Sequence, residues 1–133
     1  LEKAVKDRLV NMCHVEGAFM FTHAGVSKVW CKDSNINILG NLETQINDLF
    51  YYQPKYFQFN PYSMSDWSGN SITQPPTWIR PSALSRCAVE GFHQIVGHTG
   101  TNKIIIGKNY TTVDTLPREF LSIEDGQLII NII

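Results

Sequence analysis

Two histidines in similar surroundings are the residues best suited to chemistry in this sequence. Each follows a short apolar run and stands beside small residues: His23 precedes Ala24-Gly25, and His98 lies between Gly97 and Thr99. Neutral imidazole is the commonest nitrogen ligand for first-row metals, and small neighbours let an ion approach the ring closely. A single histidine of this kind is more often a hydrogen-bonded structural residue, so the prediction of a metal site rests on the two together.

Four short motifs resemble those of the calcineurin-like metallophosphoesterase superfamily, in its serine/threonine protein phosphatase-like branch. They are His23-Ala24-Gly25, Trp78-Ile79-Arg80, Gly97-His98-Thr99 and Thr112-Val113-Asp114-Thr115, in the family's order. The resemblance covers residues 18–129 and implies the C-terminal half of such a domain. Gly100 favours this branch, because other branches carry a second histidine there. Leu116 departs from the family, since a glycine is expected at that position.

The resemblance implies roles for five residues. His23 and His98 would bind the same one of two metal ions. Arg80 would bind the substrate phosphate, for which a planar, always charged guanidinium is well suited. Asp114 and Thr99 would support the metal-binding imidazoles rather than bind the metal themselves. No residue of this chain would itself be catalytic.

The implied chemistry is hydrolysis of a phosphate ester by a metal-activated water, with two divalent metal ions as cofactors. Histidine with carboxylate accepts manganese, iron, zinc or nickel, so the metals stay open. The substrate also stays open: a phosphoprotein, a nucleotide or a small molecule would each fit the resemblance. The region that would shape specificity, residues 31–77, matches no feature of the family. The role of the aromatic loop over residues 54–77 stays undecided between packing over the core and facing the substrate.

The family's other ligands come from motifs of the type Gly-Asp-x-His-Gly, Gly-Asp-x-Val-Asp-Arg-Gly and Gly-Asn-His, and none of these occurs in the 133 residues. Two histidines alone make a poor metal site. We therefore expect a fragment that is inactive alone and that needs a missing N-terminal half. The start at Leu1, without a methionine, and the abrupt apolar end at Ile133 lead to the same expectation.

Two alternatives remain open. The aromatic residues of the stretch 56–67 would be the recognition surface of a non-catalytic binding module, with incidental histidines. A degenerate phosphoesterase-fold protein without catalysis is the other alternative. Of the remaining histidines, His14 is expected to cap the first helix and His93 to be structural, because polar groups in loops usually serve local hydrogen bonds.

The elements that must position these residues follow from hydrophobic periodicity and turn residues. Helices are predicted over residues 1–14, 41–52 and 82–90, and strands over 18–22, 94–96, 103–106, 110–113, 119–123 and 127–130. This order predicts one α+β domain over residues 1–133, a mixed, largely antiparallel sheet with helices on one face. In the family it would be half of a metallophosphoesterase β-sandwich flanked by helices. The bare face needs a partner layer, either the missing half or a second copy in a homodimer.

Composition limits the other classes of function. Hydrophobic residues make up 43% of the chain and charged residues 17%, which is typical of a globular domain. Eleven basic and twelve acidic residues argue against non-specific nucleic-acid binding and against a polybasic membrane surface. No apolar run approaches the ~18 residues of a membrane span. Three cysteines without a Cys-x-x-Cys pair favour a reducing, cytoplasmic location.

Overall fold

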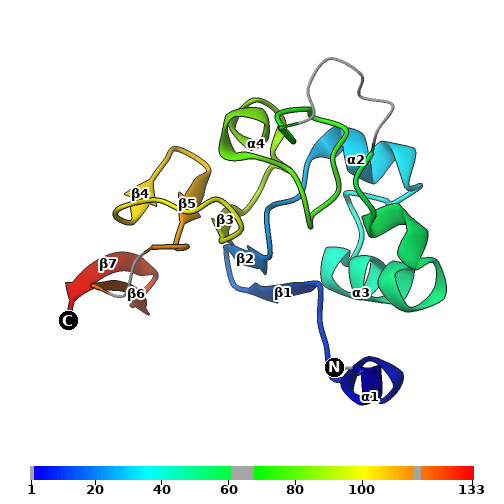
Figure 1. The fold of residues 1–133 in the computed structure, drawn as a ribbon, viewed down its shortest axis with the longest axis horizontal. Coiled ribbons are helices and arrows are strands. Elements are labelled where there is room, and N and C mark those ends of the chain that lie inside the picture. Colours follow the sequence, from blue (N-terminus) through cyan, green and yellow to red (C-terminus); the bar gives the residue numbers. More distant parts are fainter. Residues whose placement is uncertain (1, 61–67, 116–117) are drawn as a thin grey trace.

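The computed structural model describes residues 2–60, 68–115 and 118–133, and it confirms the α+β fold class. Within these residues a five-stranded sheet has helices on one side and a separate two-stranded hairpin on the other (Figure 1). The sheet has the order β1 (Cys13–Glu16), β2 (Phe19–Thr22), β3 (His93–Val96), β5 (Tyr110–Thr112) and β4 (Ile105–Ile106). The hairpin pairs β6 (Glu119–Glu124) with β7 (Gln127–Ile132).

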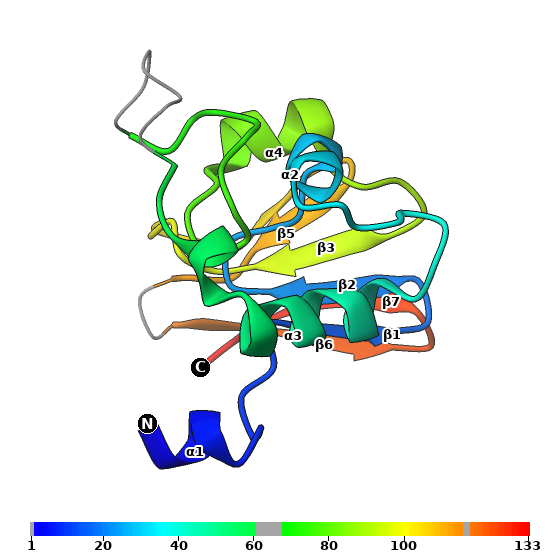
Figure 2. The same ribbon diagram turned by 90° about the vertical axis from the view of Figure 1, so that its right-hand side faces the viewer.

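Three helices cover one face of the sheet, as Figure 2 shows. They are α2 (Lys28–Asp33), α3 (Leu42–Tyr52) and α4 (Pro81–Cys87). The predicted start of α3 is confirmed, because the side chain of Asn41 accepts a hydrogen bond from the backbone N–H of Thr44 at 2.9 Å. Proline opens α4 as predicted, but this helix ends three residues before the expected Glu90.

The centre of the sheet is parallel. β3 runs parallel to both β2 and β5, with Val96 level with Thr22 on one side and Thr112 on the other. The carboxyl ends of three strands therefore meet at one edge, where side chains from distant parts of the sequence come together. The antiparallel pairs are β1–β2, β4–β5 and β6–β7, which agrees with the mixed, largely antiparallel sheet that the sequence predicts.

The core lies between the sheet and its helices in two clusters. Met20, Trp30 and Ile46 belong to the cluster under α2 and α3. Ile79, Leu84 and Val96 belong to the cluster under α4, next to the carboxyl ends of the strands. The opposite face of the sheet carries Phe21 and Ile95, and these line a small cavity together with Phe120 and Leu121 of the hairpin.

The predicted helix over residues 1–14 is wrong for most of its length. α1 (Glu2–Lys6) is a single short helix without buried residues, and Cys13–Glu16 forms the edge strand β1. A strand forms here instead of a helix because an extended backbone buries Cys13 against α3 while its neighbours point outward. A two-residue turn then leads directly from β1 into β2. His14 is therefore a strand residue and not a helix cap.

Side chains of α3 cover the outer edge of β1. Oδ1 of Asn47 accepts hydrogen bonds from the N–H groups of Met12 and Cys13 at 2.7 and 3.0 Å, and its Nδ2 donates to the carbonyl of Cys13 at 2.8 Å. Oε2 of Glu43 accepts from the N–H of Val15 at 3.0 Å. Backbone groups that an edge strand would otherwise offer to another strand are occupied in this way.

Two short elements were missed. Ser27 caps the start of α2, because its hydroxyl accepts from the N–H of Trp30 at 3.0 Å. A 3-10 turn, η1 (Pro54–Phe57), lies within the expected loop. Phe57 of this turn is buried against Trp30. Residues 61–67 of the aromatic stretch lie outside the described residues. No helix in the described ranges has the length and apolar character needed to cross a membrane.

Candidate functional site

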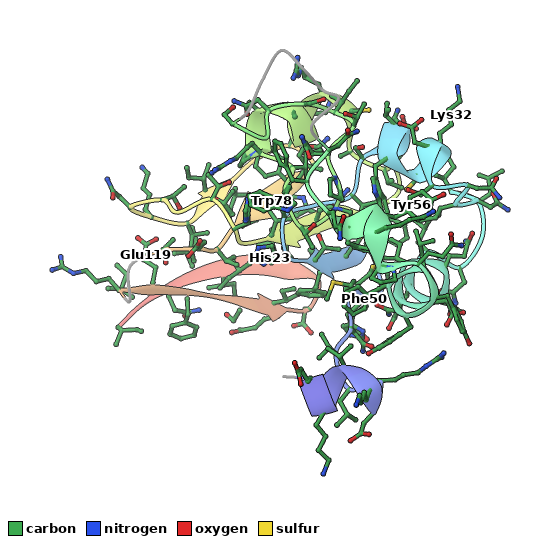
Figure 3. All side chains as sticks on the ribbon, turned by 45° about the vertical axis from the view of Figure 1, so that its right-hand side comes forward. His23, Lys32, Phe50, Tyr56, Trp78 and Glu119 are labelled. Carbon is green, nitrogen blue, oxygen red and sulfur yellow. The ribbon has the colours of Figure 1, made fainter. Side chains whose placement is uncertain are left out.

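The two histidines singled out from the sequence lie in contact at the carboxyl edge of the sheet. His23 is the first residue after β2, and His98 is the second residue after β3. Because β2 and β3 are parallel neighbours, both side chains leave the same edge, and Nε2 of His23 lies 3.0 Å from Nδ1 of His98. The rings meet edge to face with centroids 4.9 Å apart. In Figure 3 His23 and Trp78 are labelled close together near the centre of the view.

The backbone at His98 has an uncommon conformation. Its φ is +64°, and the N–H of Thr99 donates to the carbonyl of Gly97 at 2.7 Å, which closes a three-residue γ-turn around His98. A positive φ at a residue other than glycine costs about 1–3 kcal/mol in such a turn and is frequent at functional sites. The N–H of Gly97 donates to the carbonyl of His23 at 2.9 Å, so the start of this turn is tied to the other histidine.

The environment of His98 favours the neutral imidazole. Partial burial lowers the pKa of His98 first, and the neighbouring His23 and the charge of Arg80 lower it further, while Asp114 opposes them. Nε2 of His98 is buried and has no hydrogen-bond partner in the part of the chain that the structure describes. His23 is exposed. A neutral His98 therefore presents Nδ1 to its neighbour, which is the form in which imidazole binds a metal or accepts a proton.

Arg80 lies beside this pair and is held from two sides. Its Nε donates to the carbonyl of Ser68 at 2.8 Å, and its Nη1 approaches Oγ1 of Thr99 at 3.4 Å. The backbone of Arg80 donates to the carbonyl of Gly69 at 3.0 Å. Gly69 has a φ of +84°, and a Cβ there would lie 2.7 Å from the carbonyl oxygen of Trp78, so glycine is required for this close approach. No described carboxylate forms an ion pair with Arg80, which leaves its charge for an anion.

The two residues expected to support the imidazoles occupy different places. Asp114 is exposed just after β5, and its negative charge acts on His98 by raising the pKa of that imidazole. Its backbone carbonyl accepts from Thr101 at 2.8 Å. Thr99 contacts Arg80 rather than a histidine, so in this structure it helps to place the guanidinium.

Trp78 is a site residue to which the sequence analysis gave no role. Its ring meets His98 edge to face with centroids 5.6 Å apart, and it meets Phe59 in the same way at 5.3 Å. Trp78 lies in a turn, in which its N–H and that of Ile79 donate to the carbonyl of Pro75 at 2.9 and 3.1 Å. Ile79 is fully buried while Trp78 stays 41% exposed, a difference that the residue types alone do not indicate.

The described residues contain no cluster of three or more His, Cys, Asp or Glu side chains that would hold a metal ion. His23 and His98 are thus two donors that converge without a third among the described residues. The other two histidines lie elsewhere. His14 pairs with Glu43 at 3.2 Å, and Nε2 of His93 lies 2.8 Å from the hydroxyl of Thr111. Burial raises the pKa of Cys13 and of Cys31 to about 12, which keeps both thiols protonated and unreactive.

Comparison with known proteins gives a fold but no family. No protein-family model matches the chain, and no curated protein does. A matching solved structure is the cold-active protein-tyrosine phosphatase of a psychrophilic Shewanella species, with a TM-score of 0.61 at 18% identity. A mutant of a cold-active protein tyrosine phosphatase matches with a TM-score of 0.58 at 18% identity. Both alignments cover 94% of this chain and 41% of the other chain.

These comparisons correct the family expected from the four motifs. The matching structures are titled as protein-tyrosine phosphatases, which differ from the expected calcineurin-like metallophosphoesterases of the serine/threonine branch, and the assignment to that superfamily is therefore wrong. The physical reason is that the motifs combine glycine and threonine with histidine at tight turns after strands. Such turns are needed in many folds, so short motifs of this composition report local conformation. At 18% identity the likeness shows only that the chain shares the fold of part of that protein, over less than half of its length.

Proposed function

We propose that this chain carries part of the active site of a metal-dependent phosphatase, in which His23 and His98 bind one divalent ion and Arg80 binds the substrate phosphate. The observation that carries the proposal is the distance of 3.0 Å between Nε2 of His23 and Nδ1 of His98. Two nitrogens bound to one tetrahedral metal at ~2.0–2.1 Å lie about 3.3–3.4 Å apart, so a small widening of this pair would admit the ion.

The protonation of the pair supports the same proposal. A histidine must be neutral to bind a metal, and burial together with the neighbouring positive charges lowers the pKa of His98. With Nδ1 on the metal, the proton of His98 stays on Nε2, which is buried. Metal-binding histidines usually donate this proton to an acceptor that fixes the ring. The proposal therefore requires an acceptor for Nε2 from water or from a part of the protein outside the described residues.

Arg80 would recognise the phosphate. It is fixed by the carbonyl of Ser68 and by Thr99, and its charge lies close enough to affect His98. A guanidinium binds two phosphate oxygens through parallel N–H groups, which orients the phosphorus toward the histidine pair. Divalent ions, when bound, lower the pKa of a water molecule and withdraw charge from the phosphoryl oxygens.

The complete site would need more than this chain provides. Two histidines are too few donors for a tight metal site, and the chain spans 41% of the length of the phosphatase structures that it matches. We propose that the remaining ligands and a second divalent ion are held by an N-terminal half. Manganese, iron, zinc and nickel are all compatible with the donors present. A phosphoprotein, a nucleotide or a small phosphate ester would be the substrate.

The test compares this chain with a form extended upstream by ~80–100 residues, the length that completes an ordinary domain. Hydrolysis of p-nitrophenyl phosphate is measured with Mn²⁺, together with the metal content of the dialysed proteins. Activity in the extended form alone, lost in His98→Ala and kept in His14→Gln, is the expected result. His14 is a matched control because it is an exposed histidine that pairs with Glu43, away from the site.

A folded, extended protein that neither hydrolyses the ester nor retains metal would contradict the proposal and favour the binding module or the degenerate protein. For a binding module, the aromatic stretch is a poor surface in its described part. Phe57 is buried in the core, where its ring contacts Trp30 and Phe50, and Tyr56 packs against the same cluster.

A further inference from the structure

We infer that Trp78 makes this site selective for phosphate esters of aromatic alcohols, because its indole stacks against the aromatic ring of the substrate. This inference rests on the proposed function, since it requires a phosphate held between Arg80 and the histidine pair. It names the class of substrate, which the three alternatives above leave open, and it assigns the selection to one side chain.

The position of Trp78 follows from its contacts at the site. Trp78 lies in a turn, in which the N–H groups of Trp78 and Ile79 donate to the carbonyl of Pro75 at 2.9 and 3.1 Å, and Ile79 is fully buried in the cluster under α4. The ring of Trp78 meets the ring of His98, and Nη1 of Arg80 approaches Oγ1 of Thr99, the next residue along the chain. Trp78 and Arg80 therefore border the same turn around His98, so a phosphate on Arg80 brings its ester group toward the indole.

The indole is held in place from within the site. It meets the ring of His98 at an interplanar angle of 79° and the ring of Phe59 at 78°. The carbonyl of Trp78 lies against Gly69, which also binds the backbone of Arg80. The backbones of Trp78 and Arg80 thus both lie against Gly69, while the ring contacts of Trp78 and the hydrogen bonds of Arg80 to Ser68 and Thr99 place the two side chains.

Exposure distinguishes Trp78 from an ordinary packing residue. Trp78 remains 41% exposed, although indole is the largest side chain available to a core. Among the described residues its two ring contacts are both edge to face, so a face of the indole stays available to another ring. Aromatic rings attract one another in offset or edge-to-face arrangements with centroids ~4.5–7 Å apart. The ring centroids of His98 and Trp78 lie 5.6 Å apart, so a phosphate held at the histidine pair places its ester group close to the indole.

An aliphatic ester group would lack this interaction. It would gain from contact area alone, whereas an aromatic ring adds an interaction that is specific to its π-system. Selectivity must be separated from the better leaving group of aromatic esters, which would speed hydrolysis in any phosphatase. Binding of compounds that are not hydrolysed makes this separation.

The experiment uses the extended protein loaded with Mn²⁺ and two phosphonates of equal charge and similar size, phenylphosphonate and cyclohexylphosphonate. Their dissociation constants are measured by isothermal titration calorimetry. The expected result is about fivefold tighter binding of the phenyl compound, the factor that corresponds to ~1 kcal/mol of ring interaction. Trp78→Leu should abolish the preference, so that the two dissociation constants become equal within about twofold, while Trp78→Phe should keep most of the preference.

Tyr52→Leu serves as the matched control. Tyr52 is an exposed aromatic residue at the end of α3 whose ring contacts Arg8, far from the histidine pair in sequence and in its contacts. Its replacement should change neither dissociation constant. Thermal unfolding of each variant without ligand accompanies the titrations.

Equal binding of the two phosphonates to the unmodified protein would overturn the inference and leave the proposed function standing. A preference for the phenyl compound that persists in Trp78→Leu would also overturn the inference and leave the proposed function standing. A large fall in melting temperature with loss of both ligands would show that Trp78 is a packing residue, which also overturns it. Failure of a folded protein to bind either phosphonate would remove the proposed function, and this inference with it.

Discussion

Nε2 of His23 and Nδ1 of His98 lie 3.0 Å apart although 75 positions separate the two residues in the sequence. The parallel pairing of β2 with β3 brings them together, and a γ-turn with positive φ at His98 directs the second ring toward the first. At this distance the pair can share one proton but cannot carry two charges without repulsion. Its ionisation is therefore the first property to measure.

The pKa of His98 should lie below the ordinary value of ~6.5 for histidine. Since the folded protein disfavours the protonated ring, the unfolded chain binds more protons just below that pH. Stability should therefore fall as the pH drops through the unfolded pKa toward the folded one. Titration of the imidazole C–H resonances by NMR gives the pKa. Urea unfolding at pH 7 and pH 5.5 should show a smaller pH dependence in His98→Gln, and an unchanged dependence would contradict the assignment.

Arg80→Lys should weaken binding of inorganic phosphate to the extended, metal-loaded protein by about tenfold. Lysine keeps the charge but cannot reproduce the two parallel N–H groups or the hydrogen bond of Nε to Ser68. Arg86→Lys on α4 is the control, since Arg86 also donates to backbone carbonyls but in the last turn of that helix. The dissociation constant for phosphate is measured by calorimetry in both variants. Equal values would show that Arg80 does not bind the phosphate.

Gly25→Ala should destabilise the fold by ~2–4 kcal/mol. Gly25 has a φ of +121°, which side chains other than glycine rarely adopt, and a Cβ there would lie 2.4 Å from a methyl carbon of Leu84. Backbone strain and overpacking act together at this position. Gly100→Ala is the control, because a Cβ at Gly100 meets nothing within 4 Å. Urea denaturation followed by circular dichroism compares the two, and similar midpoints would contradict the packing described.

Asn47→Ala should cost ~1–3 kcal/mol of stability. The substitution removes the side chain that bonds to Met12 and Cys13 and leaves their backbone groups without those partners. Asp48→Ala, one residue along α3, removes only an exposed ion pair with Arg8 at 3.9 Å and should cost less than ~0.5 kcal/mol. The free energies of unfolding of the two variants are measured by chemical denaturation. If they differed by less than the experimental error, the contact between α3 and β1 would add little to stability.

Thiol reactivity should single out Cys87. Cys13 and Cys31 are buried with pKa values raised to about 12, whereas Cys87 is partly exposed at the end of α4. With a disulfide reagent at pH 8, one thiol should react in the folded protein and three after denaturation. If the folded Cys87→Ser variant still reacted rapidly with the reagent, Cys13 or Cys31 would have to be reached. That result would show that the core opens more readily than the structure implies.

The parts of the fold that short-range patterns determine were predictable. Asn41 with the apolar spacing behind it gave α3, and apolar runs next to glycine gave β2 and β3 and placed a histidine after each. The strand β1 was missed because Cys13 and Met12 also fit a helical spacing, and only the contact with Asn47, on a distant helix, decides between the two. The parallel register that joins His23 to His98 depends on pairing across 75 positions, which local periodicity does not contain.

The site was predicted in part for the same reason. His23 and His98 were chosen from their types and neighbours, and Arg80 from the resemblance to a family that proved wrong. The structure brings the two histidines into contact and places Arg80 close enough to affect the pKa of His98. Trp78 received no role, because an exposed tryptophan and a buried one look alike in a sequence. Only the burial of Ile79 and the ring contact with His98 place it at the site.

The covered edge of β1 limits how copies of this sheet can assemble. A fibre built by adding sheets edge to edge needs two open edges on every copy, whereas a dimer that pairs like with like needs one. In the described five-stranded sheet, Asn47 and Glu43 occupy one edge, and β4 forms the other. If copies of this sheet were to join edge to edge, only β4 would be open to a partner, and growth would end at a pair, because the α3 side chains occupy the edge that a further copy would need.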